Sequence, residues 1–212
     1  MGITCTIKNY KALQNRIDKL QDAPEKVIKN TLSDVRSRGP GWVASEVVKH
    51  YGVSKGEITG GKLGRMTIEG SGASDIKITF RGRVLTPTHF KMTPVTPPAG
   101  RSYTLKATIL RGQRSTMGKV KKLTKKQRRE LAKNLRREGT KSSPHSPIML
   151  MAPNGPYLPF QRKSTNRKDV EIIKTLSMPQ MVSSDRASPD VTRNVNDNVE
   201  KRFDHHMARF MR

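Results

Sequence analysis

The stretch DIKITFRGRVL, residues 75–85, shows where the chain changes from helix patterning to strand patterning. Its apolar residues Ile76, Ile78 and Phe80 occupy every second position, and polar or charged residues stand between them. This period of two is typical of a strand with one buried face. Helical patterns precede the stretch and further strand patterns follow it, so the sequence predicts an α+β fold with a small, mainly antiparallel sheet.

Amphipathic helices are predicted before this strand. One begins after Asn9, a second begins at Pro24 and ends at RGPG (38–41), and a third begins at Pro40 and carries Trp42 and Val43. Ser54 and Glu57 have capping-box spacing, which predicts a further helical turn. Residues 3–7 alternate like a short strand, an interpretation that we prefer over N-myristoylation of the MGITCT sequence.

Further strands are predicted after residue 85. SYTLKATIL (102–110) alternates, and SPIMLMAPNGPYLPFQR (146–162) has the pattern of a strand, an Asn-Gly turn and a second extended run. Residues 170–176 are apolar and either extended or helical. GGKLGRMTIEGSGAS (60–74) is expected to be a flexible turn or a hairpin, and GQRSTMGKV (112–120) departs from the Walker A spacing and so does not predict a phosphate loop.

A long helix is predicted at the C-terminal end, packed on the sheet or on a neighbouring subunit. Ser188 has the features of its N-cap, followed by Pro189 and Asp190 in the first turn. Apolar residues recur at spacings of three and four along it and are expected to form one packing stripe: Val191, Val195, Val199, Phe203, Met207 and Phe210.

The segment GKVKKLTKKQRRELAKNLRREGTK (118–141) has the highest density of positive charge in the chain. It holds eleven Lys or Arg residues and two acids, within a chain of formal charge +25. Thr124 and Gln127 have capping-box spacing and Gly139 is placed to end a helix, which predicts a basic helix with a narrow Leu131/Leu135 seam. Strand patterns precede and follow it, so we predict one domain, 1–212, with a basic helical excursion at 113–145.

Three interpretations of this basic segment remain open: contact with a polyanion, contact with an acidic protein surface, or plain solvation. No aromatic residue stands between the cations, so base stacking is not expected. The residues predicted to contact a polyanion or protein partner are Lys119, Lys121, Lys122, Lys125, Lys126, Arg128, Arg129, Lys133, Arg136 and Arg137.

Catalytic and metal-binding patterns are weak in this sequence. The single cysteine, Cys5, excludes an intrachain disulfide or a cysteine-rich zinc site, and the five histidines lack the spacing of helical metal ligands. His205, His206 and Asp204 lie together, but adjacent residues of a helix point about 100° apart. We therefore predict no enzymatic activity, no cofactor and no metal, and the lack of a long apolar run predicts no membrane span and no cleaved signal.

The order of these segments resembles the prophage minor tail protein Z family of tailed bacteriophages. The resemblance covers nearly the whole chain, and its most specific parts are YGVSK (51–55) and PFQR followed by VEIIKTLSMPQM (159–162 and 170–181). The long final helix ending in HHMARFM (205–211) also matches, whereas the basic segment is similar only in character.

This resemblance implies a structural virion protein, found in the host cytoplasm during assembly and then in the tail or neck of the virion. It implies a role in tail completion at the head-proximal end, where the tail becomes competent to join a filled head. The implied partners are the tail terminator, the tail tube, the tape measure and the head connector, with phage DNA in the channel as a further partner. A homo-oligomeric ring, expected to be a hexamer, is also implied.

A general nucleic-acid-binding protein, ribosomal or nucleoid-like, is the alternative that the charge supports. It predicts salt-dependent binding to free duplex DNA or RNA by a monomer or dimer. A tail protein predicts instead association with phage particles.

Overall fold

The computed structural model describes residues 24–69, 77–98, 101–120, 126, 129, 148–151, 155–162 and 170–210. Within them the fold is α+β, as predicted: helices are combined with small sheets in which every strand pair is antiparallel. In the described part of the chain, three separate sheets of two, two and three strands take the place of the one sheet expected. The predicted helix after Asn9 and the strand at 3–7 lie outside the described residues.

The described residues form two compact units where one domain was predicted. The first unit comprises those of Met1–His50, Ser54–Val84 and Leu176–Arg212. The second comprises those of Tyr51–Val53 and Leu85–Thr175. We call them the helical unit and the strand unit.

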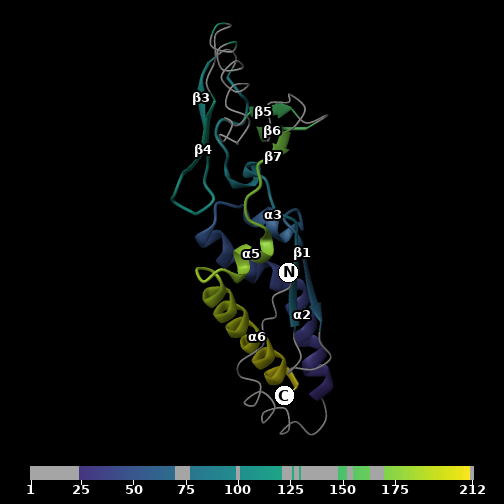
Figure 1. Ribbon diagram of the computed structural model, residues 1–212. Helices are drawn as coiled ribbons and strands as arrows, with labels where there is room; N and C mark the ends of the chain where they lie inside the picture. Colours follow the sequence, from purple (N-terminus) through teal and green to yellow (C-terminus); the bar gives the residue numbers. More distant parts are fainter. Residues whose placement is uncertain are drawn as a thin grey trace. The chain divides into compact units, whose positions relative to one another are not determined.

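Two long helices form the main part of the helical unit, α2 (Pro24–His50) and α6 (Ser188–Phe210). They lie side by side (Figure 1) and run antiparallel, because the C-terminal end of α2 meets the N-terminal end of α6. The prediction that the final helix packs on a sheet is therefore wrong, because its main packing partner is another helix. The principal contact of α6 is α2.

Helix α2 is continuous where the sequence predicted two helices. It passes through Gly39, Pro40 and Gly41 without ending, although Pro40 donates no backbone hydrogen bond. Val35 and Val43, on either side of this site, are buried, and a Cβ on Gly39 would lie 3.2 Å from Ile68 Cδ1. Burial of both halves against the rest of the unit offsets the local cost of the proline and glycines.

A hairpin and two short helices complete the helical unit. Strand β1 (Arg65–Glu69) pairs with β2 (Lys77–Arg81), so the glycine-rich stretch contributes a strand to a hairpin, one of the two predicted structures. Helix α3 (Lys55–Thr59) begins after the predicted cap Ser54, whose Oγ accepts a hydrogen bond from the Glu57 N–H. Helix α5 (Met178–Ser183) follows a capping box formed by Ser177 and Gln180.

The start of α6 differs from the prediction by one residue. Ser188 was predicted to cap the helix, but it is the first helical residue, and its N–H donates to the Ser184 carbonyl. Ser184 Oγ accepts from the Ala187 N–H at 3.3 Å. Ser184, the C-cap residue that ends α5, thus closes the turn that leads into α6.

The strand unit is built from two small sheets. Strand β3 (Tyr103–Ala107) pairs with β4 (Ser115–Val120), and β5 (Ile148–Met151), β6 (Tyr157–Arg162) and β7 (Val170–Ile172) form the other sheet in that order. The 3-10 helix η1 (Pro87–Phe90) precedes β3. Met92, Leu105 and Met149 form a buried cluster, against which Tyr103, Met117 and Tyr157 pack.

Candidate polyanion-binding surface

The residues of the predicted basic segment are described only in part. Lys119 lies on β4 and is exposed, and Lys126 and Arg129 are helical and exposed. The other seven predicted contact residues lie outside the described residues: Lys121, Lys122, Lys125, Arg128, Lys133, Arg136 and Arg137. The structure thus places the beginning of the segment on the β3–β4 sheet.

The charge of the strand unit is almost entirely positive. Nine of its described side chains are exposed Lys or Arg: Lys91, Arg101, Lys106, Arg111, Arg114, Lys119, Lys126, Arg129 and Lys174. Its single described acid, Glu171, accepts a hydrogen bond from Lys174 Nζ at 3.2 Å. This concentration of one sign of charge attracts polyanions and raises their rate of association.

Sequence reasoning missed six of these nine cations, and five of the six precede the basic segment. The signal that could have found them is the distribution of acids: the sequence holds no Asp or Glu between Asp75 and Glu130, while residues 76–129 hold fifteen Lys or Arg. The basic segment 118–141 overlaps only the end of this longer acid-free region. The candidate surface therefore extends back through β3.

In the helical unit, by contrast, acids lie at the contact between the two long helices. His50 Nε2 of α2 lies 2.9 Å from Asp190 Oδ2 of α6, and His206 Nε2 of α6 lies 3.1 Å from Asp34 Oδ2 of α2. Each helix thus supplies the histidine of one pair and the aspartate of the other. These pairs connect the helices near both ends.

A third polar contact lies between these two pairs and involves a buried acid. Asn194 Nδ2 donates to Glu46 Oε1 at 2.9 Å and to the Trp42 carbonyl at 3.2 Å, and Lys49 Nζ lies 2.6 Å from Glu46 Oε2. Buried carboxylates are tolerated when their oxygens have such partners. The acids of this contact are therefore engaged in holding the helices together.

The apolar stripe of the final helix packs inside the chain. Its first five predicted residues, Val191 to Met207, are buried, whereas Phe210 is 36% exposed. Leu32, Val35 and Val43 are among the buried residues of α2. Most of the stripe is thus buried in the α2–α6 contact, and its last residue, Phe210, is accessible to solvent.

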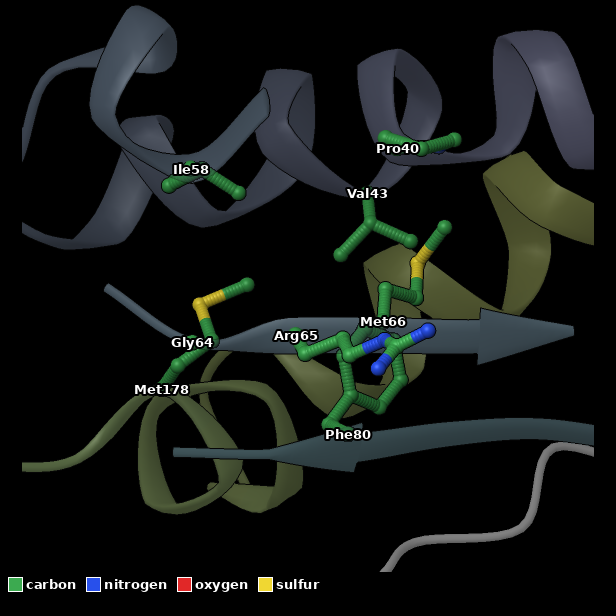
Figure 2. Close-up of a pocket in the computed structure, with 8 residues that line it drawn as sticks. All are labelled: Pro40, Val43, Ile58, Gly64, Arg65, Met66, Phe80 and Met178. Atoms are coloured by element: carbon green, nitrogen blue, oxygen red, sulfur yellow. The ribbon is translucent and has the colours of Figure 1, made fainter. Parts of the chain in front are cut away.

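A small apolar pocket lies between α2 and the β1–β2 hairpin. Figure 2 shows Val43 of α2 pointing toward Met66 and Phe80 of the hairpin, with Pro40 beside them. The space that remains is about 10 Å³, room for about one water molecule. The pocket is a gap in the packing beside the proline and is too small for a cofactor or a substrate.

Within the described ranges, no three His, Cys, Asp or Glu side chains are grouped so that they could hold a metal ion. His206, one of the residues considered for this role, is buried with its Nε2 directed at Asp34. Among the described helices, none is long and apolar enough to cross a membrane.

The chain was compared with protein-family models, with curated proteins and with solved structures, and none of the three comparisons found a significant match.

Proposed function

We propose that this chain is a structural virion protein of a tailed bacteriophage, a tail-completion or neck component at the head-proximal end of the tail. In this proposal it acts without catalysis or a cofactor. It forms a homo-oligomeric ring, expected to have six subunits, that contacts the tail terminator, tail tube, tape measure or head connector. We assign the chain to this class of protein because the order of its segments resembles that of the minor tail protein Z family.

The charge of the strand unit is the structural observation that supports this proposal best. Its described side chains include nine exposed cations and one acid. This imbalance favours a polyanionic partner. In a neck ring, such a partner is either the DNA that passes through the channel or the end of an acidic protein bundle that the ring holds. The helical unit, with its engaged acids, then serves as the folded support of the subunit.

Electron microscopy of lysates with and without the gene product tests the role in the virion. In its absence we expect headless tails beside DNA-filled heads, and supplying the protein in trans should restore joined particles. Normal virions without the protein would exclude the proposal.

A second test concerns the basic segment alone. Replacing Lys125, Lys126, Arg128 and Arg129 by Gln should leave the folded protein intact and yield tails that join heads poorly. The matched control replaces four exposed cations of the helical unit by Gln: Lys26, Lys29, Arg36 and Arg193. Infectious particles in normal yield from the first variant would exclude a role for the segment in joining.

General nucleic-acid binding is the second candidate, and the acid-free region between Asp75 and Glu130 favours it. A protein of this class binds free duplex DNA or RNA outside any particle. Sedimentation of lysates discriminates the two: a tail protein sediments with particles after nuclease treatment, whereas a nucleoid or ribosomal protein is released by the nuclease or stays with ribosomes.

A further inference from the structure

The outer face of the β3–β4 sheet carries lysine and threonine side chains. Thr104 pairs with Lys119 and Lys106 pairs with Thr116, which places these four residues on one face. Lys106, Thr116 and Lys119 are exposed and Thr104 is half-buried. The two lysines are diagonal neighbours across the pair, with Cα atoms about 7–8 Å apart.

A β-bulge puts Lys119 on this face. Thr116 and Lys119 are three positions apart, so in a regular strand they would point to opposite faces. The register shifts between Leu105 and Lys106, and this leaves Met117 as an extra residue on β4. Gly118 accommodates the bulge with φ 157°, a conformation that L-residues with a side chain rarely adopt.

A third extended segment widens the same face. Thr93 and Lys106 exchange both backbone hydrogen bonds, with N–O distances of 2.8 and 2.9 Å. Thr93 is therefore directly opposite Lys106 on the other side of β3, and its side chain is exposed. Across three extended segments the order is Thr93, Lys106, Thr116.

The apolar residues of the sheet lie on its other face. Leu105 is fully buried with Met92 and Met149, and Tyr103 and Met117 pack against this cluster. The aromatic ring of the hairpin is therefore directed inward. The outer face offers cations and hydrogen-bond donors without an apolar centre.

We propose that this outer face binds the phosphodiester backbone of nucleic acid through Lys106, Lys119 and the hydroxyls of Thr93, Thr104 and Thr116. Lysine ammoniums and threonine hydroxyls are common partners of phosphate oxygens, and they carry no base information. A protein interface usually has an apolar core, whereas nucleic-acid interfaces are polar and positive. The face lacks an aromatic platform, so binding is independent of base sequence.

This site lies upstream of the predicted basic segment, except for Lys119, and it does not depend on a role in the virion. The register of β3, β4 and Thr93 defines the site. A tail protein and a nucleoid protein would both be able to use it.

Titration of a fluorescein-labelled 24-base-pair duplex with the full-length chain at several salt concentrations tests the proposal. We expect the Lys106→Gln/Lys119→Gln variant to bind on the order of tenfold more weakly near 0.1 M salt. The slope of log K against log salt should fall in magnitude by about 1.8, the value for two lost phosphate contacts.

The matched control is Lys26→Gln/Lys29→Gln, which removes the same charge from two exposed residues of α2. It should bind with nearly the wild-type affinity and salt slope. Thermal unfolding of both variants checks that each is folded. A loss in the control equal to that in the first variant would show that total charge, and not this face, determines binding.

A third variant separates hydroxyl contacts from charge. Thr93→Val/Thr116→Val keeps the β-branched shape of both residues, so the strands should be preserved. We expect a severalfold loss of affinity with an unchanged salt slope, because neutral donors release no counterions. An unchanged affinity would show that these threonine hydroxyls do not contact the nucleic acid.

Two further outcomes would overturn the proposal as a whole. One is the absence of duplex binding by the wild-type chain at 50 mM salt. The other is equal competition by polyglutamate at the same charge concentration, which would assign the face to an acidic protein. Duplexes of different base composition should bind alike, and a strong preference among them would contradict backbone recognition.

Discussion

The helical unit and the strand unit differ in what their charges contact. The helical unit has ten described acids beside sixteen described Lys or Arg residues, and acids such as Asp34, Glu46 and Asp190 lie in the α2–α6 contact. The strand unit has one described acid beside nine exposed cations. Acids thus take part in packing in the helical unit, whereas exposed cations predominate among the described charges of the strand unit. Substitutions in each unit test this division.

Gly52→Ala should have the largest effect. The Gly52 N–H donates to the Ile109 carbonyl at 3.0 Å, and a Cβ at this position would lie 1.8 Å from the Thr108 carbonyl oxygen. Because the backbone itself would have to move, we expect a loss of at least about 4 kcal/mol in the free energy of unfolding of the strand unit. Denaturant unfolding followed by circular dichroism measures it. Gly56→Ala, with no atom within 4 Å of its Cβ, is the control and should lose no stability.

Phe203→Ala should have the next largest effect, in the helical unit. Phe203 is 1% exposed, and its removal leaves a cavity at the apolar α2–α6 contact. We expect a loss of about 3–4 kcal/mol in the free energy of unfolding, measured in urea. Phe210→Ala, on the same helix, should cost less than about 1 kcal/mol. Equal losses would show that Phe210 is covered by another surface in solution.

Asp34→Asn tests the polar contact between the helices. The carboxylate lies 3.1 Å from His206 Nε2 and 3.7 Å from Arg202 Nε, and His206 is buried. We expect a loss of about 1–2 kcal/mol at pH 7, because the substitution weakens a hydrogen bond to a buried group. Asp190→Asn at the other end should cost about 0.5 kcal/mol, since both partners there are more exposed. The reverse order would contradict the assignment of Asp34 as the main polar contact.

Gly41→Ala should stabilise the helical unit slightly. Gly41 lies inside α2 with no atom within 4 Å of an added Cβ, so alanine gains helix propensity without a clash. We expect a gain of about 0.5–1 kcal/mol, visible as a higher melting temperature. At Gly39 the added Cβ meets Ile68 at 3.2 Å, so Gly39→Ala should gain less. A destabilised Gly41→Ala variant would mean that the helix does not continue through this site.

Tyr103→Phe should have the smallest effect, confined to high pH. Burial raises the pKa of Tyr103 above 10.0, and a hydrogen bond from the Met149 backbone partly opposes this. Above pH 10 the unfolded chain therefore ionises before the folded chain, and stability falls as the pH rises toward the folded-state pKa. The stability difference between wild type and Tyr103→Phe should be constant below pH 9 and shift against the wild type by pH 11. A difference independent of pH would contradict the burial of the phenol.

Local patterns predicted several elements well. The alternation of Ile78 and Phe80 predicted β2, and the alternation of Tyr103 and Leu105 predicted β3. The Ser54 cap was also confirmed. These signals act within a few residues, through burial of one strand face or satisfaction of a free amide, so a single sequence contains them.

Strand β4 and the continuous α2 could not be predicted in the same way. Strand β4 contains the Met117 bulge, which breaks the period of two, and Gly112 before it and Gly118 within it resemble the glycines of a phosphate loop. Helix α2 passes through RGPG because its two halves are buried against other elements. In both cases a distant contact outweighs the local signal.

The α+β class, the stripe on the final helix and the large positive charge can be read from the sequence alone. Each follows from the types and spacing of residues along one element. The tertiary structure decided that α6 packs on α2 and that Lys106 and Lys119 share one face of a sheet. Strand register, a bulge and helix pairing join residues far apart in the chain, and the free energy of such contacts depends on partners that local spacing does not specify.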